Sequence, residues 1–264
     1  MPMILSAEYP LHVETSGDDR RPCLLLLNPL GTTLEYWEPM LETFEERNWV
    51  VRFDIRGHGR SAGEIGEFNI AGLVADALAV LDALEVPRAH VLGDSMGALV
   101  AAVLASDHPG RVDRLVLASC GVHLGNHVWW GDVANTVQES GMRDVADKLE
   151  EAYFSEEWRQ AVPELAEAAR AMFLSVDADV FVTGALLLKD LSLEGIDGRI
   201  QASTLLIGGE QDPFFKHYPI TDLLSMIPSS EAVNASGARH RVLLEQPDLL
   251  SSVINEFLSD PDAR

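Results

Sequence analysis

Three side chains in this sequence have the types and the order needed for nucleophilic catalysis. The first is Ser95, at the centre of a Gly-x-Ser-x-Gly pattern at positions 93–97. A serine hydroxyl is a poor nucleophile near neutral pH, so it needs a histidine to accept its proton and a carboxylate to orient that histidine. We therefore expect both partners in the chain after Ser95.

His240 is the candidate general base, because it follows a late predicted strand and precedes the last predicted helix. Asp212 is the first candidate for the acid. It lies in a turn after a buried strand, and the proline that follows it favours an extended backbone. Glu210, nearer the strand end, is the alternative acid. His58 lies between two glycines and is interpreted as a turn residue, not a catalytic one.

The residues around Ser95 predict a strand, a sharp turn and a helix. An apolar run at 90–92 precedes the serine, and an Ala-rich run at 96–105 follows it. Glycines at 93 and 97 let the helix fold back against the strand, as in a nucleophile elbow. The alternative is a glycine-rich turn whose serine only caps the helix.

A second loop can supply donors for an oxyanion hole. The apolar run at 23–27 predicts a strand buried on both faces, and the sequence Asn-Pro-Leu-Gly-Thr follows it. Pro29 has no N–H to donate, so Leu30 is the predicted donor, with Asn28 and Gly31 shaping the loop. The N–H of Met96, next to the serine, is the predicted second donor.

The rest of the chain alternates between short apolar runs and amphipathic segments, which include a predicted helix at about 35–47 and a predicted strand at 49–53. Continuous apolar runs are typical of parallel strands, and the weak alternation at 1–14 favours an edge hairpin. Between about 123 and 196 the strand pattern stops and helical spacing takes over. We predict an α/β fold with a mostly parallel eight-stranded sheet flanked by helices, built from residues 1–122 and 197–264, with a helical cap at 123–196 over the active site.

Composition excludes several classes of partner. The net charge of -23, from 42 acidic and 19 basic residues, argues against binding to nucleic acid or to an anionic membrane. No apolar run approaches the length of a membrane span, and no signal peptide is recognisable, so we expect a soluble, cytoplasmic protein. Cys23 and Cys120 are expected to be buried thiols in a reducing compartment, and no metal or organic cofactor is predicted.

Taken together, these motifs resemble those of the α/β-hydrolases and, within them, the 3-oxoadipate enol-lactonases of aromatic catabolism. The similar parts are the elbow, the loop at 28–32 with Trp37, the stretch at 54–61, the cap segment at 141–159 and the ending at 240–247. The resemblance implies the α/β-hydrolase fold, Ser95, Asp212 and His240 as the triad, and a small ester or lactone as the substrate. The candidate substrate contacts are Asn28, Gly31, Trp129, Trp130, Arg143 and Arg241.

Two positions depart from this family. Asp94 stands where these enzymes usually carry a neutral apolar residue, and Arg241 where they usually carry a small or apolar one.

The same triad would also serve a carboxylesterase, a thioesterase, a carbon–carbon bond hydrolase or a cofactor-free perhydrolase. A hypothesis of another class is a small-molecule receptor on a hydrolase scaffold. The sequence leaves a homo-oligomer open.

Overall fold

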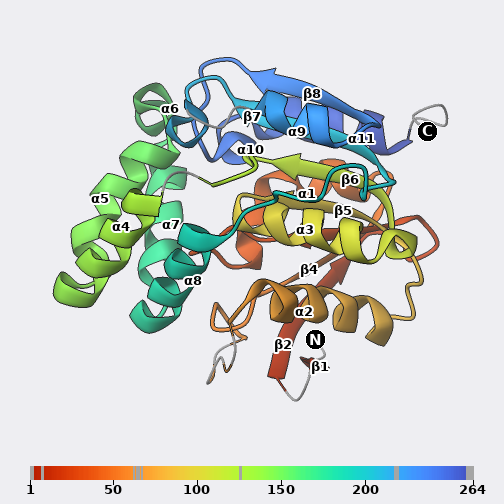
Figure 1. The fold of residues 1–264 in the computed structure, drawn as a ribbon, viewed down its shortest axis with the longest axis horizontal. Coiled ribbons are helices and arrows are strands. Elements are labelled where there is room, and N and C mark those ends of the chain that lie inside the picture. Colours follow the sequence, from red (N-terminus) through yellow and green to blue (C-terminus); the bar gives the residue numbers. More distant parts are fainter. Residues whose placement is uncertain are drawn as a thin grey trace.

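One sheet of eight strands organises the computed structural model, which describes residues 3–6, 9–61, 63, 66, 68–124, 127–216 and 220–259 (Figure 1). The strand order is β1-β2-β4-β3-β5-β6-β7-β8. Only β1 with β2, and β2 with β4, pair antiparallel, so the mostly parallel sheet is confirmed. The strands are β1 Met3–Ser6, β2 Tyr9–Ser16, β3 Cys23–Leu27, β4 Trp49–Phe53, β5 Ala89–Asp94, β6 Val112–Ala118, β7 Ser203–Gly209 and β8 Ser230–Ala235.

The register of the central strands brings the site loops to one edge of the sheet. Every residue of β3 and β5 is buried, as expected for strands covered on both faces. Leu27 pairs with Gly93, and Asp94 pairs with Ala118, so β3, β5 and β6 end side by side. The loops that follow these three strands therefore open at the same carboxyl edge.

Helices cover both faces of the sheet. In Figure 1, α2, α3 and α9 lie in front of it and α1 and α11 behind it. The helix predicted at 35–47 is a 3-10 turn, η1, followed by the shorter α1. The other 3-10 turns are η2 Pro109–Arg111 and η3 Pro213–Lys216. The elements near the sheet are η1 Leu34–Trp37, α1 Glu38–Glu45, α2 Ile70–Ala83, α3 Met96–Asp107, α9 Ile220–Met226, α10 Val242–Glu245 and α11 Pro247–Ser259.

Five helices between β6 and β7 lie together beside the sheet, on the left of Figure 1. The two ends of this segment run next to each other. The N–H of Leu193 donates to the carbonyl oxygen of Val122 at 2.9 Å, and His123 and Ser192 form an antiparallel bridge. The helices are α4 His127–Ser140, α5 Met142–Tyr153, α6 Glu156–Ala161, α7 Pro163–Leu174 and α8 Ala178–Asp190.

Over the described residues, no single helix has both the length and the apolar composition to cross a bilayer. Only α7 and α8 together reach them, as a pair bent by 96°. Cys23 and Cys120 are free thiols and both are buried, as expected. Burial raises the pKa of Cys23 to about 12 and raises that of Cys120 as well.

Candidate active site

Ser95 occupies a tight turn between β5 and α3. Its backbone lies at φ 55 and ψ −116, in a region that residues other than glycine rarely adopt. The turn tolerates no side chain on either flank. A Cβ at Gly93 would lie 2.2 Å from the carbonyl oxygen of Gly97, and a Cβ at Gly97 would lie 2.0 Å from that of Leu27. The two glycines are therefore required for the close packing of helix on strand.

A chain of hydrogen bonds joins Ser95, His240 and Asp212. The Ser95 Oγ lies 2.9 Å from the His240 Nε2, and the His240 Nδ1 lies 2.7 Å from the Asp212 Oδ2. The other carboxylate oxygen of Asp212 accepts from the N–H of Phe214 at 2.8 Å. With Asp212 accepting from Nδ1–H, the neutral imidazole presents the lone pair of Nε2 to the serine hydroxyl. This is the arrangement that can take a proton from Ser95.

Aromatic rings enclose the imidazole of His240. The ring of Tyr153 stacks on it at a centroid distance of 5.4 Å, and Phe214 meets it edge-on at 4.5 Å. The hydroxyl of Ser119 donates to the carbonyl oxygen of His240 at 2.5 Å, which fixes the backbone beneath the ring. The His240 and Asp212 side chains are wholly buried, so water does not compete for their hydrogen bond.

Glu210, the alternative acid, points elsewhere. Its Oε2 accepts from the Ser236 hydroxyl at 2.7 Å and from the Gly237 N–H at 3.1 Å. These two hydrogen bonds lower the pKa of this exposed carboxyl, and the one from Ser236 has the larger effect. The structure thus places Asp212, and not Glu210, on the imidazole.

The two predicted oxyanion donors come from loops that lie against each other. A Cβ at Gly97 would lie 2.8 Å from the carbonyl oxygen of Asn28, so the loop after β3 packs on the first turn of α3. Met96 is the first residue of α3, and its N–H has no acceptor within the helix. The N–H of Leu30 makes no hydrogen bond to the described part of the chain. Both groups keep their donor capacity for a ligand.

Side chains from several elements hold the loop after β3. The Asn28 Oδ1 accepts from the Trp37 Nε1 at 2.6 Å, which agrees with the predicted role of Asn28 in shaping the loop. The Thr32 hydroxyl donates to the carbonyl oxygen of Pro29 at 2.8 Å. Gly31 has φ +81, which favours glycine, and lines a cavity of about 40 Å³.

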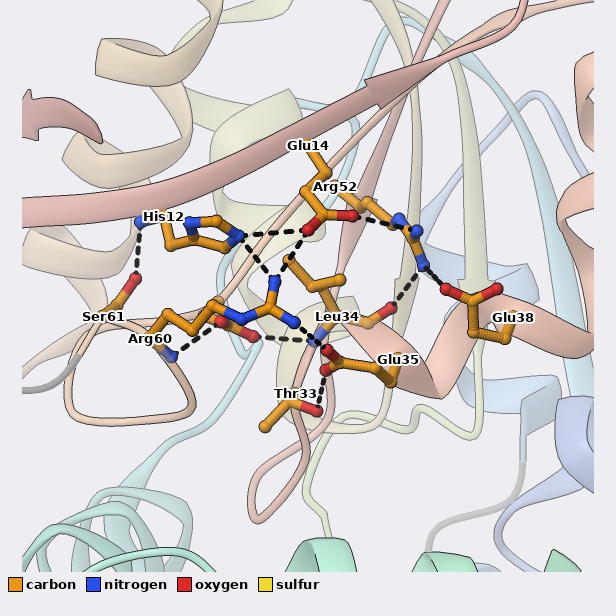
Figure 2. A network of polar contacts seen from close by, with 10 residues as sticks. His12, Glu14, Thr33, Leu34, Glu35, Glu38, Arg52, Arg60 and Ser61 are labelled. Carbon is orange, nitrogen blue, oxygen red and sulfur yellow. Dashed lines mark hydrogen bonds and ion pairs between the residues drawn. The ribbon is translucent and has the colours of Figure 1, made fainter. Parts of the chain in front are cut away.

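A polar network fastens the far end of this loop to the sheet (Figure 2). The N–H of Leu34 donates to the Asp54 Oδ1 at 2.8 Å, and its carbonyl oxygen accepts from the Arg52 Nη1 at 3.1 Å. Arg60 lies beside Arg52 in the same network. Both arginines form ion pairs with Glu14. Arg52 also pairs with Glu38, and Arg60 pairs with Glu35.

Asp94 and Arg241, the two departures from the family pattern, contact each other. Asp94 is fully buried and accepts from the Tyr36 hydroxyl at 2.5 Å. The Arg241 Nη1 lies 3.7 Å from the Asp94 Oδ2, and the guanidinium lies over the ring of Tyr153 at 4.3 Å. Burial raises the pKa of Asp94, and the charge of Arg241 opposes that rise. The carboxylate therefore lies against a cation and not in solvent.

The other predicted substrate contacts divide into three groups. Arg241 lines the same small cavity as Gly31. Trp130 is buried, and it stacks on Phe214 at 5.9 Å, while the partly buried Trp129 meets Phe214 edge-on at 4.8 Å. Arg143 is exposed on α5 and does not line that cavity.

Sequence reasoning missed three aromatic residues of this site, Tyr36, Tyr153 and Phe214. A signal existed for Phe214, because it follows Asp212 and Pro213 in the same turn. Tyr153 is the last residue of a helix, and the direction in which its side chain points depends on how that helix packs. No group of three or more His, Cys, Asp or Glu side chains that could hold a metal ion occurs within the described residues.

Comparisons with known proteins give a consistent result. A family model described as alpha/beta hydrolase fold matches residues 22–247. Over 210 residues, the chain is 29% identical to 3-oxoadipate enol-lactonase 2 of Acinetobacter baylyi, a match that covers 80% of this chain and 79% of that enzyme. It is 26% identical over 262 residues to the putative carbamate hydrolase RutD of Agrobacterium fabrum, covering 96% and 99% of the two chains.

The fold comparison agrees. The crystal structure of the enol-lactonase from Burkholderia xenovorans matches with a TM-score of 0.93 and 26% sequence identity. The match covers 98% of this chain and 100% of that one. The sheet, the flanking helices and the helical segment between β6 and β7 are therefore similar to those of a solved enol-lactonase over nearly the whole chain.

Proposed function

Because the chain belongs to the α/β-hydrolase family and is a hydrolase that acts on ester bonds, we propose that it cleaves a small lactone or ester through an acyl-enzyme on Ser95. Support comes from one observation above all, the buried chain of hydrogen bonds from Ser95 through His240 to Asp212. Asp212, His240 and Ser95 are the acid, the base and the nucleophile of this proposal.

In the first step, the Oγ of Ser95 attacks the carbonyl carbon while the Nε2 of His240 takes the hydroxyl proton. Asp212 holds the Nδ1–H and stabilises the imidazolium that forms. The carbonyl oxygen becomes an oxyanion, which accepts hydrogen bonds from the N–H groups of Leu30 and Met96. Each such donor typically contributes about 10²–10³ in turnover. His240 then protonates the leaving oxygen as its bond to carbon breaks, and the acyl group stays on Ser95.

In the second step, a water molecule attacks the acyl carbon. His240 accepts a proton from this water, and the same two N–H groups hold the second oxyanion. When the bond from carbon to the Ser95 Oγ breaks, the imidazolium returns the proton to the serine. The acid is released and the Ser95 hydroxyl is regenerated. For a lactone, this acid and the hydroxyl formed when the ring opened are parts of one product molecule.

The likeness to two enol-lactonases over most of the chain favours a lactone as the substrate. A carbamate is the competing class, because the putative carbamate hydrolase matches almost the whole chain. The two classes use the same nucleophile and differ in the atoms attached to the reacting carbonyl. A panel of substrates separates them.

The test is steady-state hydrolysis of 3-oxoadipate enol-lactone, a short-chain aryl ester and a simple carbamate by the wild type and by Ser95→Ala. Ser106→Ala, on the same helix, is the matched control. We expect Ser95→Ala to lower kcat on the preferred substrate by at least about 10³-fold and the control to keep it.

Turnover of the ester without the enol-lactone would leave the serine mechanism standing and reject the enol-lactone. Preference for the carbamate would reject an ester or lactone as the substrate. Turnover that is unchanged in Ser95→Ala, or absent on all three substrates, would contradict the proposal and bring the receptor hypothesis forward.

A further inference from the structure

The peptide that joins Leu30 to Gly31 is held at both ends by buried side chains from distant parts of the sequence. Its N–H, on Gly31, donates to the His58 Nε2 at 3.2 Å. Its C=O, on Leu30, accepts from the Arg241 Nη2 at 3.1 Å. His58 is 0% exposed and Arg241 is 3% exposed, so neither hydrogen bond is shared with bulk water.

We propose that Arg241 is a positioning residue that, together with His58, clamps this peptide and so keeps the neighbouring N–H of Leu30 directed at the oxyanion. The inference rests on the proposed function, because it concerns the oxyanion donor of the same reaction. It assigns Arg241 a different role from the substrate contact predicted by its charge alone.

The peptide needs to be clamped because the residue on one side of it, Gly31, is a glycine. A peptide unit is planar, with its donor and acceptor on opposite sides, so it can flip only by rotating about the bonds on either side. The two angles that change in such a flip are ψ of Leu30 and φ of Gly31. Glycine accepts either sign of φ at little steric cost, so the φ of +81 at Gly31 is not fixed by the residue itself. Hydrogen bonds at both ends oppose the rotation that glycine permits.

Arg241 is itself held in place by the residues around it. Its backbone N–H donates to the carbonyl oxygen of Tyr153 at 2.9 Å, and its guanidinium lies over the same residue's ring. Asp94 balances its charge at 3.7 Å and is anchored by the Tyr36 hydroxyl. A buried cation can thus hold the Leu30 carbonyl without adding a net charge beside the nucleophile.

The pair also connects the three parts of the site through the backbone. Asp94 directly precedes Ser95, and Arg241 directly follows His240. The contact between them, with the hydrogen bond to Leu30, therefore ties the segments that carry the nucleophile, the base and the oxyanion donor. A shift of any one segment would change the other two.

The competing role for Arg241 is direct contact with an anionic substrate. Its side chain lines the small cavity beside Gly31, and the Nη1 has no hydrogen-bond partner among the described residues. Positioning and substrate binding predict different kinetics. Positioning affects every substrate in the transition state, whereas contact with a carboxylate affects the binding of anionic substrates only.

The experiment measures kcat and KM of the wild type, Arg241→Met and Arg241→Lys on two aryl esters with one leaving group. One ester is neutral, and the other carries a carboxylate on its acyl chain. Binding of an alkylboronic acid, which forms a tetrahedral adduct on the serine, supplies a second readout. For Arg241→Met we expect kcat to fall about 10- to 100-fold on both esters, KM to stay within about threefold, and boronate affinity to fall in parallel.

Arg241→Lys keeps the charge opposite Asp94 and one donor near Leu30. It should recover part of kcat on both esters, and it keeps the test decisive if the methionine variant does not fold. An unchanged kcat in folded Arg241→Met, or in Arg241→Lys if only that variant folds, would overturn the inference while leaving Ser95-dependent turnover intact. A rise in KM confined to the carboxylate ester would also overturn it, in favour of substrate binding. If the wild type shows no Ser95-dependent turnover, the proposed function itself fails and the inference falls with it.

Discussion

His58 is a buried residue that contacts the loop after β3. Its Nε2 accepts from Gly31, and its Nδ1 lies 3.2 Å from the carbonyl oxygen of Arg56. Burial lowers the pKa of His58 to about 4, so the ring is neutral near pH 7 and keeps one acceptor nitrogen. A protonated ring would present a donor to the N–H of Gly31, and the hydrogen bond would be lost. The interpretation of His58 as a structural residue agrees with these contacts.

The lowered pKa of His58 predicts a loss of stability as the pH falls. Between about pH 6.5 and pH 4, the unfolded chain binds a proton at His58 and the folded chain does not, so the free energy of unfolding rises with pH in this window. The contribution is fully present above the unfolded pKa. We expect His58 to account for a decrease of about 2 kcal/mol between pH 7 and pH 5, measured by urea unfolding.

His58→Gln is the control, because glutamine retains an acceptor and does not titrate. The pKa of His90 is also lowered by burial and adds a slope of the same sign, which both proteins share. The difference between their pH profiles therefore isolates His58. Parallel profiles for the two proteins would show that His58 does not have a lowered pKa.

At the residue scale, the sequence predicts those functional groups whose role depends on their neighbours in the chain. Ser95 has its glycines beside it, and Asp212 and His240 follow strands that end at the same edge. The contact between Asp94 and Arg241 could not be predicted, because it joins two loops far apart in the sequence. Burial of a carboxylate beside a nucleophile depends on where its counter-charge lies, and no local pattern encodes that.

At the element scale, Glu245 joins the helices between β6 and β7 to the loop that carries His240. Its Oε2 accepts from the N–H of Ser155 at 3.0 Å and from the Ser155 hydroxyl at 2.5 Å. Its Oε1 accepts from the N–H of Arg239 at 2.6 Å. Ser155 is also the N-cap of α6, where its hydroxyl accepts from the N–H of Trp158. One carboxylate thus fixes the start of α6 relative to the loop that carries His240.

Removal of this carboxylate should destabilise the protein. Glu245→Ala leaves the N–H groups of Ser155 and Arg239 without their charged acceptor. We expect the free energy of unfolding to fall by about 2 to 3 kcal/mol, measured by chemical denaturation.

Glu210→Ala is the matched control, since Glu210 also accepts from a serine hydroxyl and a backbone N–H but does not reach the helical segment. A much smaller loss of stability is expected for this exposed residue. Equal losses in the two variants would contradict the role assigned to Glu245.

The strands were more predictable than the packing of the helices. The strand predicted at 49–53 matches β4 in full, because a short apolar run buried in a sheet has clear ends. The helix predicted at 35–47 instead begins as the 3-10 turn η1 and ends at Glu45. Between β6 and β7, periodicity predicted helices, but which side chains face His240 depends on packing between helices, as Tyr153 shows.

For the whole molecule, the net charge of -23 creates a repulsive field for anionic substrates. Salt screens this field beyond about 10 Å at 0.1 M. We expect kcat/KM for a carboxylate-bearing ester to rise about two- to fivefold as NaCl increases from about 0.02 M to about 0.3 M. The neutral ester with the same leaving group is the internal control and should change little. A decrease with salt for the anionic ester would mean that local cations, such as Arg241, outweigh the overall charge.

The meeting of Val122 and Leu193 has a consequence for how such a molecule can diversify. The segment between them begins and ends at nearly the same point beyond β6, so its length does not affect the pairing of β6 with β7. Insertions or deletions there that keep Tyr153 and Ser155 in place would leave the strand register intact, and with it the contacts around His240. The helical segment can therefore change in length over evolution without any change in the sheet, while its contacts with the loop of His240 limit which of its helices can be exchanged.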